Sequence, residues 1–205
     1  RSLRFNSADS AYLNRTPSSA GNRKTWTWSA WVKRSTSSAN LAIWGVRGSS
    51  AAEGESFVMQ FGGYGSGDDV LVIGYGNAAW KITNQVFRDF GAWYHLVVAF
   101  NSTESTGSNR LKLYVNGTQV TSFATDTAPT LNLDSAVNNA VAHRLGSYFS
   151  GSAQYFNGYL AEVNFIDGTA LDPTSFGAFD ASGVWQAKDT SGLTFGTNGF
   201  RLKFA

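Results

Sequence analysis

The chain has 205 residues, a length that one all-β sandwich can occupy without a second full-sized domain. Charged residues make up only 15% of it and the formal net charge is +2, so it lacks the basic footprint that nucleic-acid binding requires. It contains no cysteine, which excludes disulfides, thiolate metal sites and a cysteine nucleophile. Its apolar runs are far shorter than a membrane span. From the low charge we therefore expect no nucleic acid as a partner, and from the short apolar runs no membrane.

Apolar and polar residues alternate with a period of two along much of the chain, and clusters of Gly, Asn, Asp or Ser separate these stretches. This pattern is typical of strands joined by turns, and no stretch has the spacing of an amphipathic helix. In chain order, the expected strands are Leu3–Asn6, Lys24–Lys33, Leu41–Val46, Phe57–Phe61, Val70–Tyr75, Trp80–Thr83, Trp93–Phe100, Leu111–Val115, Val141–Gly146 and Tyr159–Ile166. The fold class is therefore all-β, and the lack of a fixed repeat favours a two-sheet sandwich over a propeller or solenoid.

Turn signals divide these strands. Asn116-Gly117 suits a tight turn in which both central residues have positive φ, so we expect Leu111–Val115 to form a hairpin with Gln119–Phe123. Residues 62–67 are rich in glycine. They do not read as a phosphate-binding loop, because neither a Lys-Ser/Thr pair nor a helix follows them, so we expect a second hairpin loop there. From Ala181 onward the chain is glycine-rich with two short apolar bursts, which predicts an arm laid on the sandwich or leading out of it.

Three stretches carry a family pattern. They are the aromatic strand Thr25–Lys33, the Trp-x-His strand Trp93–Phe100 with the following Leu111–Gly117, and the late strand Phe156–Val163. Together they resemble the laminin-G-like group of the concanavalin A-like superfamily. The resemblance implies an antiparallel jelly roll of two sheets over residues 1–180, followed by a C-terminal arm over residues 181–205. It also implies that Leu3–Asn6 pairs with Tyr159–Ile166.

The later part of the chain adds a closer resemblance. Its segments Phe165–Leu171, Ser175–Gly177, Gly183–Trp185 and Gly196–Phe200 are similar to those of structural proteins of marine bacteriophages. This resemblance implies a location on the exterior of a virion, in a fibre, a spike or a capsid decoration. It implies other virion proteins and further copies of this chain as partners, so we expect a homo-oligomer.

The superfamily includes glucanases, so an enzyme is one alternative. Retaining glucanases of this fold place two carboxylates about 5–5.5 Å apart, on alternate residues of one strand. Here Glu162 is the only acid in a late strand, and no second carboxylate follows on its face. Glu53 and Glu55 are spaced by two but lie in an expected loop, and no nucleophile-elbow sequence accompanies His95 or His143. We therefore expect no enzymatic activity, with a polysaccharide-degrading glycoside hydrolase as the less favoured alternative.

Aromatic residues are the remaining candidates for a binding site, because sugar rings stack on the faces of Trp and Tyr. Four of them lie in the glycine-rich middle of the chain, namely Trp44, Tyr64, Tyr75 and Trp80. They favour a carbohydrate-binding adhesin that recognises host cell-surface glycan. Burial of the same rings would instead leave a purely structural cement or decoration protein with no sugar ligand.

Asp68 and Asp69 are candidate ligands for calcium, which many relatives in this fold bind through loop carboxylates and carbonyls. Their spacing is not diagnostic, and adjacent acids in a glycine-rich turn can equally be solvated. We expect no other cofactor, since a zinc site would need more ligands than two distant histidines supply.

Overall fold

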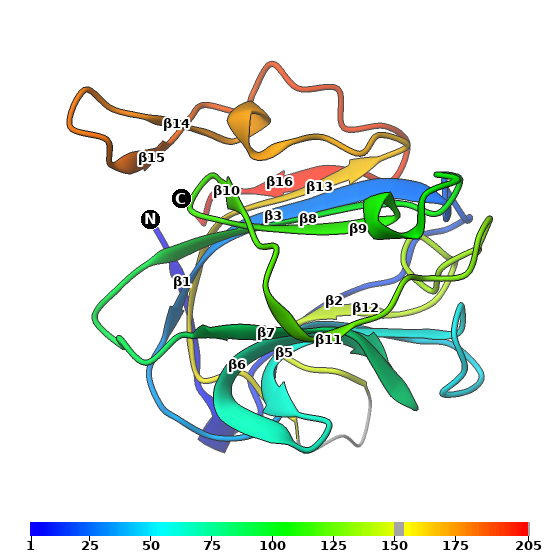
Figure 1. Cartoon of the computed structure of the whole chain (residues 1–205), viewed down its shortest axis with the longest axis horizontal. Helices are drawn as coiled ribbons and strands as arrows, with labels where there is room; N and C mark the ends of the chain where they lie inside the picture. Colours follow the sequence, from blue (N-terminus) through cyan, green and yellow to red (C-terminus); the bar gives the residue numbers. More distant parts are fainter. Residues whose placement is uncertain (150–153, 205) are drawn as a thin grey trace.

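Two antiparallel sheets of seven strands each face one another in the computed structural model, which describes residues 1–149 and 154–204 (Figure 1). The first sheet contains, in spatial order, β1 (Leu3–Phe5), β13 (Gly158–Asp167), β3 (Thr25–Arg34), β8 (Tyr94–Asn101), β9 (Leu111–Val115) and β10 (Thr118–Gln119), with β16 (Phe200–Leu202) also paired to β13. The second sheet has the order β11 (Phe123–Asp126), β7 (Ala78–Val86), β6 (Ser66–Tyr75), β5 (Ser56–Gly63), β4 (Leu41–Arg47), β12 (His143–Leu145) and β2 (Leu13–Arg15). The all-β, two-sheet sandwich expected from the sequence is confirmed.

A smaller pair of strands, β14 (Gly177–Phe179) and β15 (Trp185–Ala187), lies outside the sandwich. The helical segments of the described residues are three single 3-10 turns, η1 (Ser7–Asp9), η2 (Gly107–Asn109) and η3 (Pro173–Ser175). None of the helices in the described ranges is long and apolar enough to cross a membrane.

Alternation along β3 builds the centre of the core. Trp26 points between the sheets, stacks on Phe100 with ring centroids 4.9 Å apart, and meets the ring of Trp44 edge-on at 5.6 Å. Two residues further on, Trp28 lies parallel to Trp44 with centroids 5.7 Å apart. Aromatic pairs in these geometries stabilise beyond the burial of their area, so facing rings from β3 and β4 join the two sheets. Trp31 has the opposite parity and points to the other face of β3.

The strand pairing expected near the N-terminus is confirmed. Leu3 pairs with Leu160, and Phe5 pairs with Gly158, in antiparallel register. The late strand β13 thereby separates the N-terminal β1 from β3 in the first sheet.

The expected hairpin after β9 is confirmed at its turn and wrong in its second strand. Asn116 and Gly117 have φ of 48° and 81°, as a two-residue hairpin turn requires, and Gln119 pairs with Tyr114. However, β10 ends at Gln119, and Phe123 pairs with Thr83 in the second sheet. The hairpin is short because the chain leaves the first sheet there and crosses to the edge of the second.

Residues 168–199 lie over the outer face of the first sheet and form a third layer (Figure 1). Trp185 anchors this layer, because it is 7% exposed and its Nε1 donates a hydrogen bond to Nδ1 of His95 at 2.9 Å. Phe176 packs against Val97 of the sheet below. The β14–β15 hairpin spans residue 181, where the C-terminal arm was expected to start, and β16 is a strand of the first sheet. The described residues of this C-terminal part therefore belong to the packed structure.

Candidate functional site

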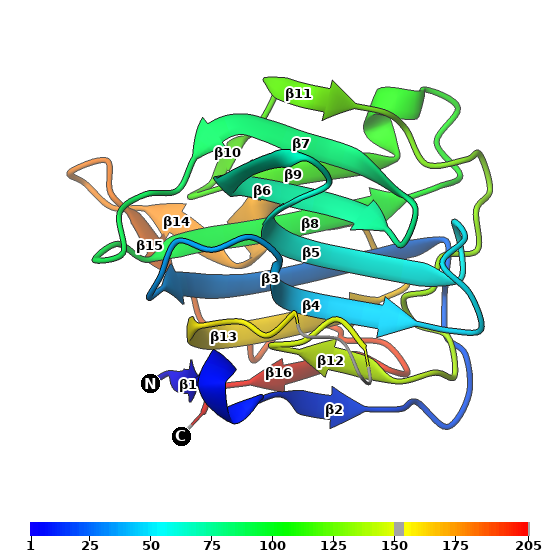
Figure 2. The ribbon, with the colours of Figure 1, turned by 90° about the horizontal axis from the view of Figure 1, so that it is seen from below.

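A cleft opens between the two sheets along the side where both have an edge. There β2 is the last strand of the second sheet, while β1 and β16 both lie along the outer side of β13 in the first sheet (Figure 2). The cleft has a volume of about 380 Å³, which is within the range of small-molecule sites. Its walls come from β2, β12 and β16, three short strands that are far apart in the sequence.

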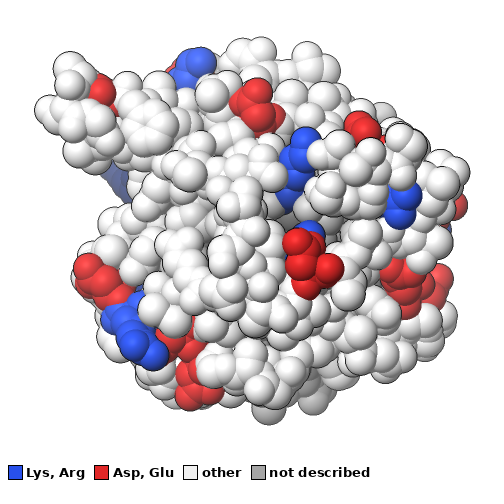
Figure 3. Space-filling view, viewed as in Figure 1, with Lys and Arg blue, Asp and Glu red and all other residues white. Residues whose placement is uncertain are grey.

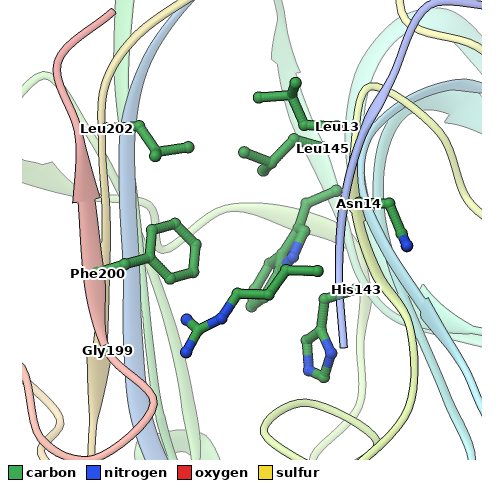
Figure 4. A pocket seen from close by; sticks show the side chains of 9 residues that line it. Leu13, Asn14, His143, Leu145, Gly199, Phe200 and Leu202 are labelled. Carbon is green, nitrogen blue, oxygen red and sulfur yellow. The ribbon is translucent and has the colours of Figure 1, made fainter. Parts of the chain in front are cut away.

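Apolar side chains form both walls of the cleft. Figure 4 shows Phe200 and Leu202 of β16 facing Leu13 and Leu145 across it. Leu13 pairs with Leu145 in the β2–β12 ladder, so the period of two points both side chains to the same face. Trp44 lines the inner end of the cleft and is 2% exposed. An apolar site with aromatic rings can accommodate the C–H face of a sugar or another apolar group.

Arg15 supplies the charge of the cleft. Its guanidinium carbon lies 5.3 Å from the ring centroid of Phe200, and its Nη1 donates to the carbonyl of Asn198. Among the described residues that line the cleft, Arg15 alone is charged. Asn14 lies between Leu13 and Arg15 in β2, so its side chain points to the opposite face, away from the cavity (Figure 4). The stacked guanidinium can therefore donate hydrogen bonds to a ligand at the mouth.

His143 also lines the cleft, but both of its ring nitrogens are engaged. Nδ1 lies 2.7 Å from the carbonyl oxygen of Val141, and Nε2 accepts a hydrogen bond from the backbone N–H of Asn138 at 2.8 Å. Burial is the main reason that the pKa of His143 falls to about 4. The imidazole is therefore neutral near pH 7 and forms part of the wall.

A partly buried polar network around Asp167 holds the loops beside the cleft. Its carboxylate accepts hydrogen bonds from Asn138 Nδ2 at 2.6 Å, from the N–H of Asn22 at 2.8 Å and from the N–H of Asn198 at 3.0 Å. Asn198 Nδ2 donates in turn to Asn138 Oδ1 at 2.9 Å. The network thereby fixes Asn138, the partner of the His143 ring, and Asn198, the partner of Arg15.

The four aromatic residues expected to stack on sugar rings do not share one exposed surface. Trp44 and Trp80 are each 2% exposed, because both lie in the core between the sheets, and this corrects the expectation that they line a sheet face. Tyr75 is half-buried and packs on Trp80 with ring centroids 5.3 Å apart. Tyr64 is half-buried in the turn between β5 and β6, and its hydroxyl donates to the carbonyl of Tyr75. Of the four, Trp44 reaches the cleft.

Asp69, one of the two expected calcium ligands, binds two arginines. Its Oδ1 lies 3.0 Å from Nη1 of Arg34, its Oδ2 lies 3.1 Å from Nε of Arg88, and Ser37 Oγ donates to it at 2.8 Å. These bonds hold the pKa of Asp69 below its usual range, and the hydrogen bond from Ser37 contributes most. Asp68 is exposed, and its carbonyl accepts a hydrogen bond from Arg34 at 3.1 Å. A calcium ion at Asp69 would have to displace an arginine.

Asp68 and Asp69 lie in β6 and not in the glycine-rich turn expected from the sequence, and they bind the fully buried side chain of Arg34. Burial lowers the pKa of Arg34, and the Asp69 carboxylate opposes that shift. Within residues 1–149 and 154–204, no three His, Cys, Asp or Glu side chains gather in a way that could hold a metal ion.

His95 forms a buried polar chain with Ser29 and Trp185. Its Nε2 lies 2.9 Å from Ser29 Oγ, and its Nδ1 accepts from Trp185 Nε1 at 2.9 Å. An indole N–H can only donate, so Nδ1 carries no proton and the proton of the neutral ring is on Nε2. Burial lowers the pKa of His95 to about 4, which keeps the ring neutral. A Ser-His-Asp triad needs the opposite tautomer, in which Nε2 is free to accept the serine proton. The hydrogen bonds of Ser29, His95 and Trp185 therefore support a structural role for His95.

The carboxylates considered for glycoside cleavage have hydrogen-bond partners within the fold. Glu162 Oε2 accepts from Nη2 and Nε of Arg201 at 2.9 and 3.1 Å, which ties β16 to β13. Glu53 accepts from Trp80 Nε1 at 2.8 Å, and Glu55 accepts from Ser49. None of the three lines the cleft.

Sequence reasoning missed most of the cleft. Leu13 and Arg15 point to one face of β2 and Asn14 points to the other, but a strand of three residues is too short to be distinguished from a polar loop in the sequence. Phe200 belongs to an apolar burst near the C-terminus and to the segment Gly196–Phe200, and neither feature predicts a place in a cleft. Its pairing with Phe165 depends on β16 returning to the first sheet, which no local signal predicts.

The sequence matches the model of one known protein family. Residues 6–175 match the family model described as the concanavalin A-like lectin/glucanases superfamily, which is well over half of the chain. Among curated proteins, no sequence matches this one.

Solved structures with the same fold are similar to this chain at low sequence identity. A candidate carbohydrate binding protein from Bacteroides ovatus is 16% identical with a TM-score of 0.58, over 84% of this chain and 44% of that one. The heptameric SAP-like pentraxin from Limulus polyphemus is 14% identical with a TM-score of 0.57, over 83% of this chain and 76% of that one. A tailspike protein of an Escherichia coli bacteriophage is 15% identical with a TM-score of 0.55, over 85% of this chain and 23% of that one. This chain thus spans less than half the length of the first and third proteins, and the likeness extends to the fold alone.

Proposed function

We propose that this chain, which belongs to the concanavalin A-like lectin/glucanases superfamily, is a non-enzymatic carbohydrate-binding module carried on the exterior of a phage particle. The observation that carries the proposal is the cleft between the sheet edges, with its apolar walls, the ring of Phe200 and the stacked guanidinium of Arg15. Sugar recognition combines these elements, because the C–H face of a pyranose packs on an aromatic ring while hydroxyl groups take hydrogen bonds from a fixed donor.

The proposed virion location rests on two likenesses. Segments between residues 165 and 200 resemble structural proteins of marine bacteriophages, and one structure with a similar fold is a bacteriophage tailspike protein. A single shallow sugar site binds weakly, and repeated copies on a particle would raise avidity without new contacts. We therefore propose that the module acts as an oligomer with other virion proteins and with copies of itself.

The non-enzymatic character is supported by the groups near the cleft. The described residues that line it include no carboxylate, whereas glycoside cleavage uses a pair of them. We expect incubation with laminarin or agarose oligosaccharides to release no new reducing ends. Cleavage that Glu162→Gln abolishes would contradict this part of the proposal.

The binding test uses two exposed residues of the cleft, Arg15 and Leu13. Arg15→Gln removes the donor at the mouth, and Leu13→Ser removes apolar wall from a side chain that is 38% exposed. Each should weaken binding to its best ligand in a panel of neutral and acidic oligosaccharides about fivefold, since one lost contact is worth about 1 kcal/mol. Leu131→Ser is the matched control, because Leu131 is 47% exposed and lies outside the cleft. Equal effects from Leu13→Ser and Leu131→Ser, or no binding in the panel, would overturn the proposal.

A purely structural role is the second candidate, and the β14–β15 hairpin favours it. Phe179 and Val184 are 55% and 52% exposed on this hairpin, which projects from the body of the molecule (Figure 1). The projecting hairpin shows little charge apart from one acidic patch in Figure 3, and a surface of exposed apolar side chains is typical of protein contacts. Light scattering on the protein with Phe179→Ser and Val184→Ser should then show loss of an oligomer. An unchanged oligomeric state would remove this support.

A further inference from the structure

Two arginines on the outer face of the second sheet have no acidic partner among the described residues. Arg47 is the last residue of β4 and Arg144 is the central residue of β12. Both line a cavity of about 230 Å³, together with Gly48, Ala142 and Phe149. Neither guanidinium makes a hydrogen bond or ion pair with any residue in the ranges 1–149 and 154–204, and Nε of Arg144 is fully buried without a partner.

Strand pairing brings the two guanidinium groups to the same place. Arg144 pairs with Gly45 across the β12–β4 ladder, and Arg47 is two residues beyond Gly45 on the same face. Such diagonal neighbours lie about 7–8 Å apart at the backbone, within reach of long side chains. Gly45 is needed there, because a Cβ would lie 2.4 Å from Cα of Tyr148, the residue before Phe149, which lines the cavity.

Aromatic rings hold both guanidinium planes. Arg47 lies over Phe149 with its guanidinium carbon 4.9 Å from the ring centroid, and Arg144 lies over Tyr12 at 4.8 Å. Stacking fixes the plane of a guanidinium and leaves its N–H edge free to bind a carboxylate or sulfate in a bidentate way. Glu55, whose carboxylate lies beside Gly48, accepts hydrogen bonds from Ser49 and none from Arg47.

Like charges that are neighbours across a ladder repel each other, and burial of Nε without a partner adds a further cost. An anion between the two arginines would offset the repulsion between their charges. We propose that Arg47 and Arg144 bind the sulfate or carboxylate group of an acidic saccharide. The inference rests on the proposed carbohydrate-binding function and specifies its ligand class. His143 and Leu145 point from the same strand into the cleft, so the anion site and the cleft lie on opposite faces of β12, beside the sheet edge at β2.

Inorganic sulfate is the first probe, because it tests the anion site without any sugar. Titration into the full chain, followed by NMR of the arginine Nε–H signals, should give saturable shifts of Arg47 and Arg144. Arg47→Gln and Arg144→Gln should each weaken sulfate binding about tenfold. Arg88→Gln is the charge-matched control, since Arg88 has a side chain that is 73% exposed and lies outside the cavity. Absence of saturable shifts, or equal weakening by Arg88→Gln, would overturn the anion site.

A pair of galactan oligosaccharides then separates the two proposals. A sulfated carrageenan oligosaccharide should bind more tightly than a neutral agarose oligosaccharide, and Arg144→Gln should abolish the difference. If both oligosaccharides bind equally and Arg144→Gln has no effect, the ligand class is wrong and the carbohydrate function stands. If sulfate binds but no saccharide does, the carbohydrate function fails and, with it, the inference about its ligand class.

Discussion

Acid should destabilise the protein through His95 well above the pH at which carboxylates titrate. Burial lowers the pKa of His95 to about 4, whereas the unfolded chain should have a value of about 6.5. As the pH falls, the unfolded state therefore binds the proton first. The stability linked to His95 is complete above about pH 7 and is lost as the pH falls from about 6.5 to about 4.

The magnitude follows from the two pKa values. Between pH 8 and pH 5, preferential protonation of the unfolded state should lower the free energy of unfolding by about 2 kcal/mol for His95. Burial is also the main cause that lowers the pKa of His143 to about 4, so this residue should contribute a similar loss. We expect the unmodified chain to lose about 4 kcal/mol over this range. Asp69, whose pKa is held below its usual range, titrates below this window.

Urea unfolding followed by tryptophan fluorescence at pH 8 and pH 5 measures this loss. His95→Gln removes the titrating ring while keeping a polar side chain between Ser29 and Trp185, so the loss should fall to about 2 kcal/mol. A lower stability of the variant at both pH values does not affect the comparison, because only the difference between them is used. His143→Gln should behave in the same way. An unchanged pH dependence in His95→Gln would show that the buried ring does not control acid stability.

Three further predictions concern the Asp69 ion pair, calcium and the turn at Gly117. Asp69→Asn should lower stability by about 3–5 kcal/mol, because it leaves the buried charge of Arg34 without its anion, whereas Asp68→Asn should have little effect in the same thermal melt. Since Asp69 is already bound by arginines, millimolar calcium should leave the melting temperature unchanged, and a rise that Asp69→Asn abolishes would establish the calcium site instead. Gly117→Ala should cost about 2–4 kcal/mol, because φ is +81° and a Cβ would lie 2.4 Å from the ring of Trp185. Gly65→Ala, with φ of +74° and nothing within 4 Å of the added Cβ, should cost less, and equal losses would rule out the steric contribution.

The local pattern of the chain was enough to predict the strands and their class. Alternation of apolar and polar residues marks the long strands because successive side chains point to opposite faces of a sheet. Asn116-Gly117 identified a turn because few residue pairs tolerate two positive φ angles. Both signals depend on neighbours in the sequence, so they are readable without the fold. The pairing of Leu3–Asn6 with Tyr159–Ile166 came from the family resemblance instead.

The candidate site could not be predicted in the same way, because it depends on contacts between distant segments. Leu13, Leu145 and Phe200 form one cleft only after β2, β12 and β16 reach the edges of the two sheets. Alternation predicts that neighbouring residues face opposite ways, but it does not say which face is covered. Thus Trp44 and Trp80 lie inside the sandwich although their sequence surroundings suit an exposed, glycine-rich surface.

The partners of charged residues also depend on the fold and could not be predicted from the sequence. The sequence displayed Asp68 and Asp69 as free carboxylates and gave no sign that the side chain of Arg34, 35 residues earlier, is buried against Asp69. Likewise, nothing local distinguishes Arg47 and Arg144, which lack an acidic partner in the described residues, from Arg201, which binds Glu162 and Asp189. Residue type determines what a side chain can bind. Whether its partner is an acid of the same chain, or a ligand, depends on the three-dimensional packing, because Coulomb and hydrogen-bond interactions depend on distance in space and not on separation along the sequence.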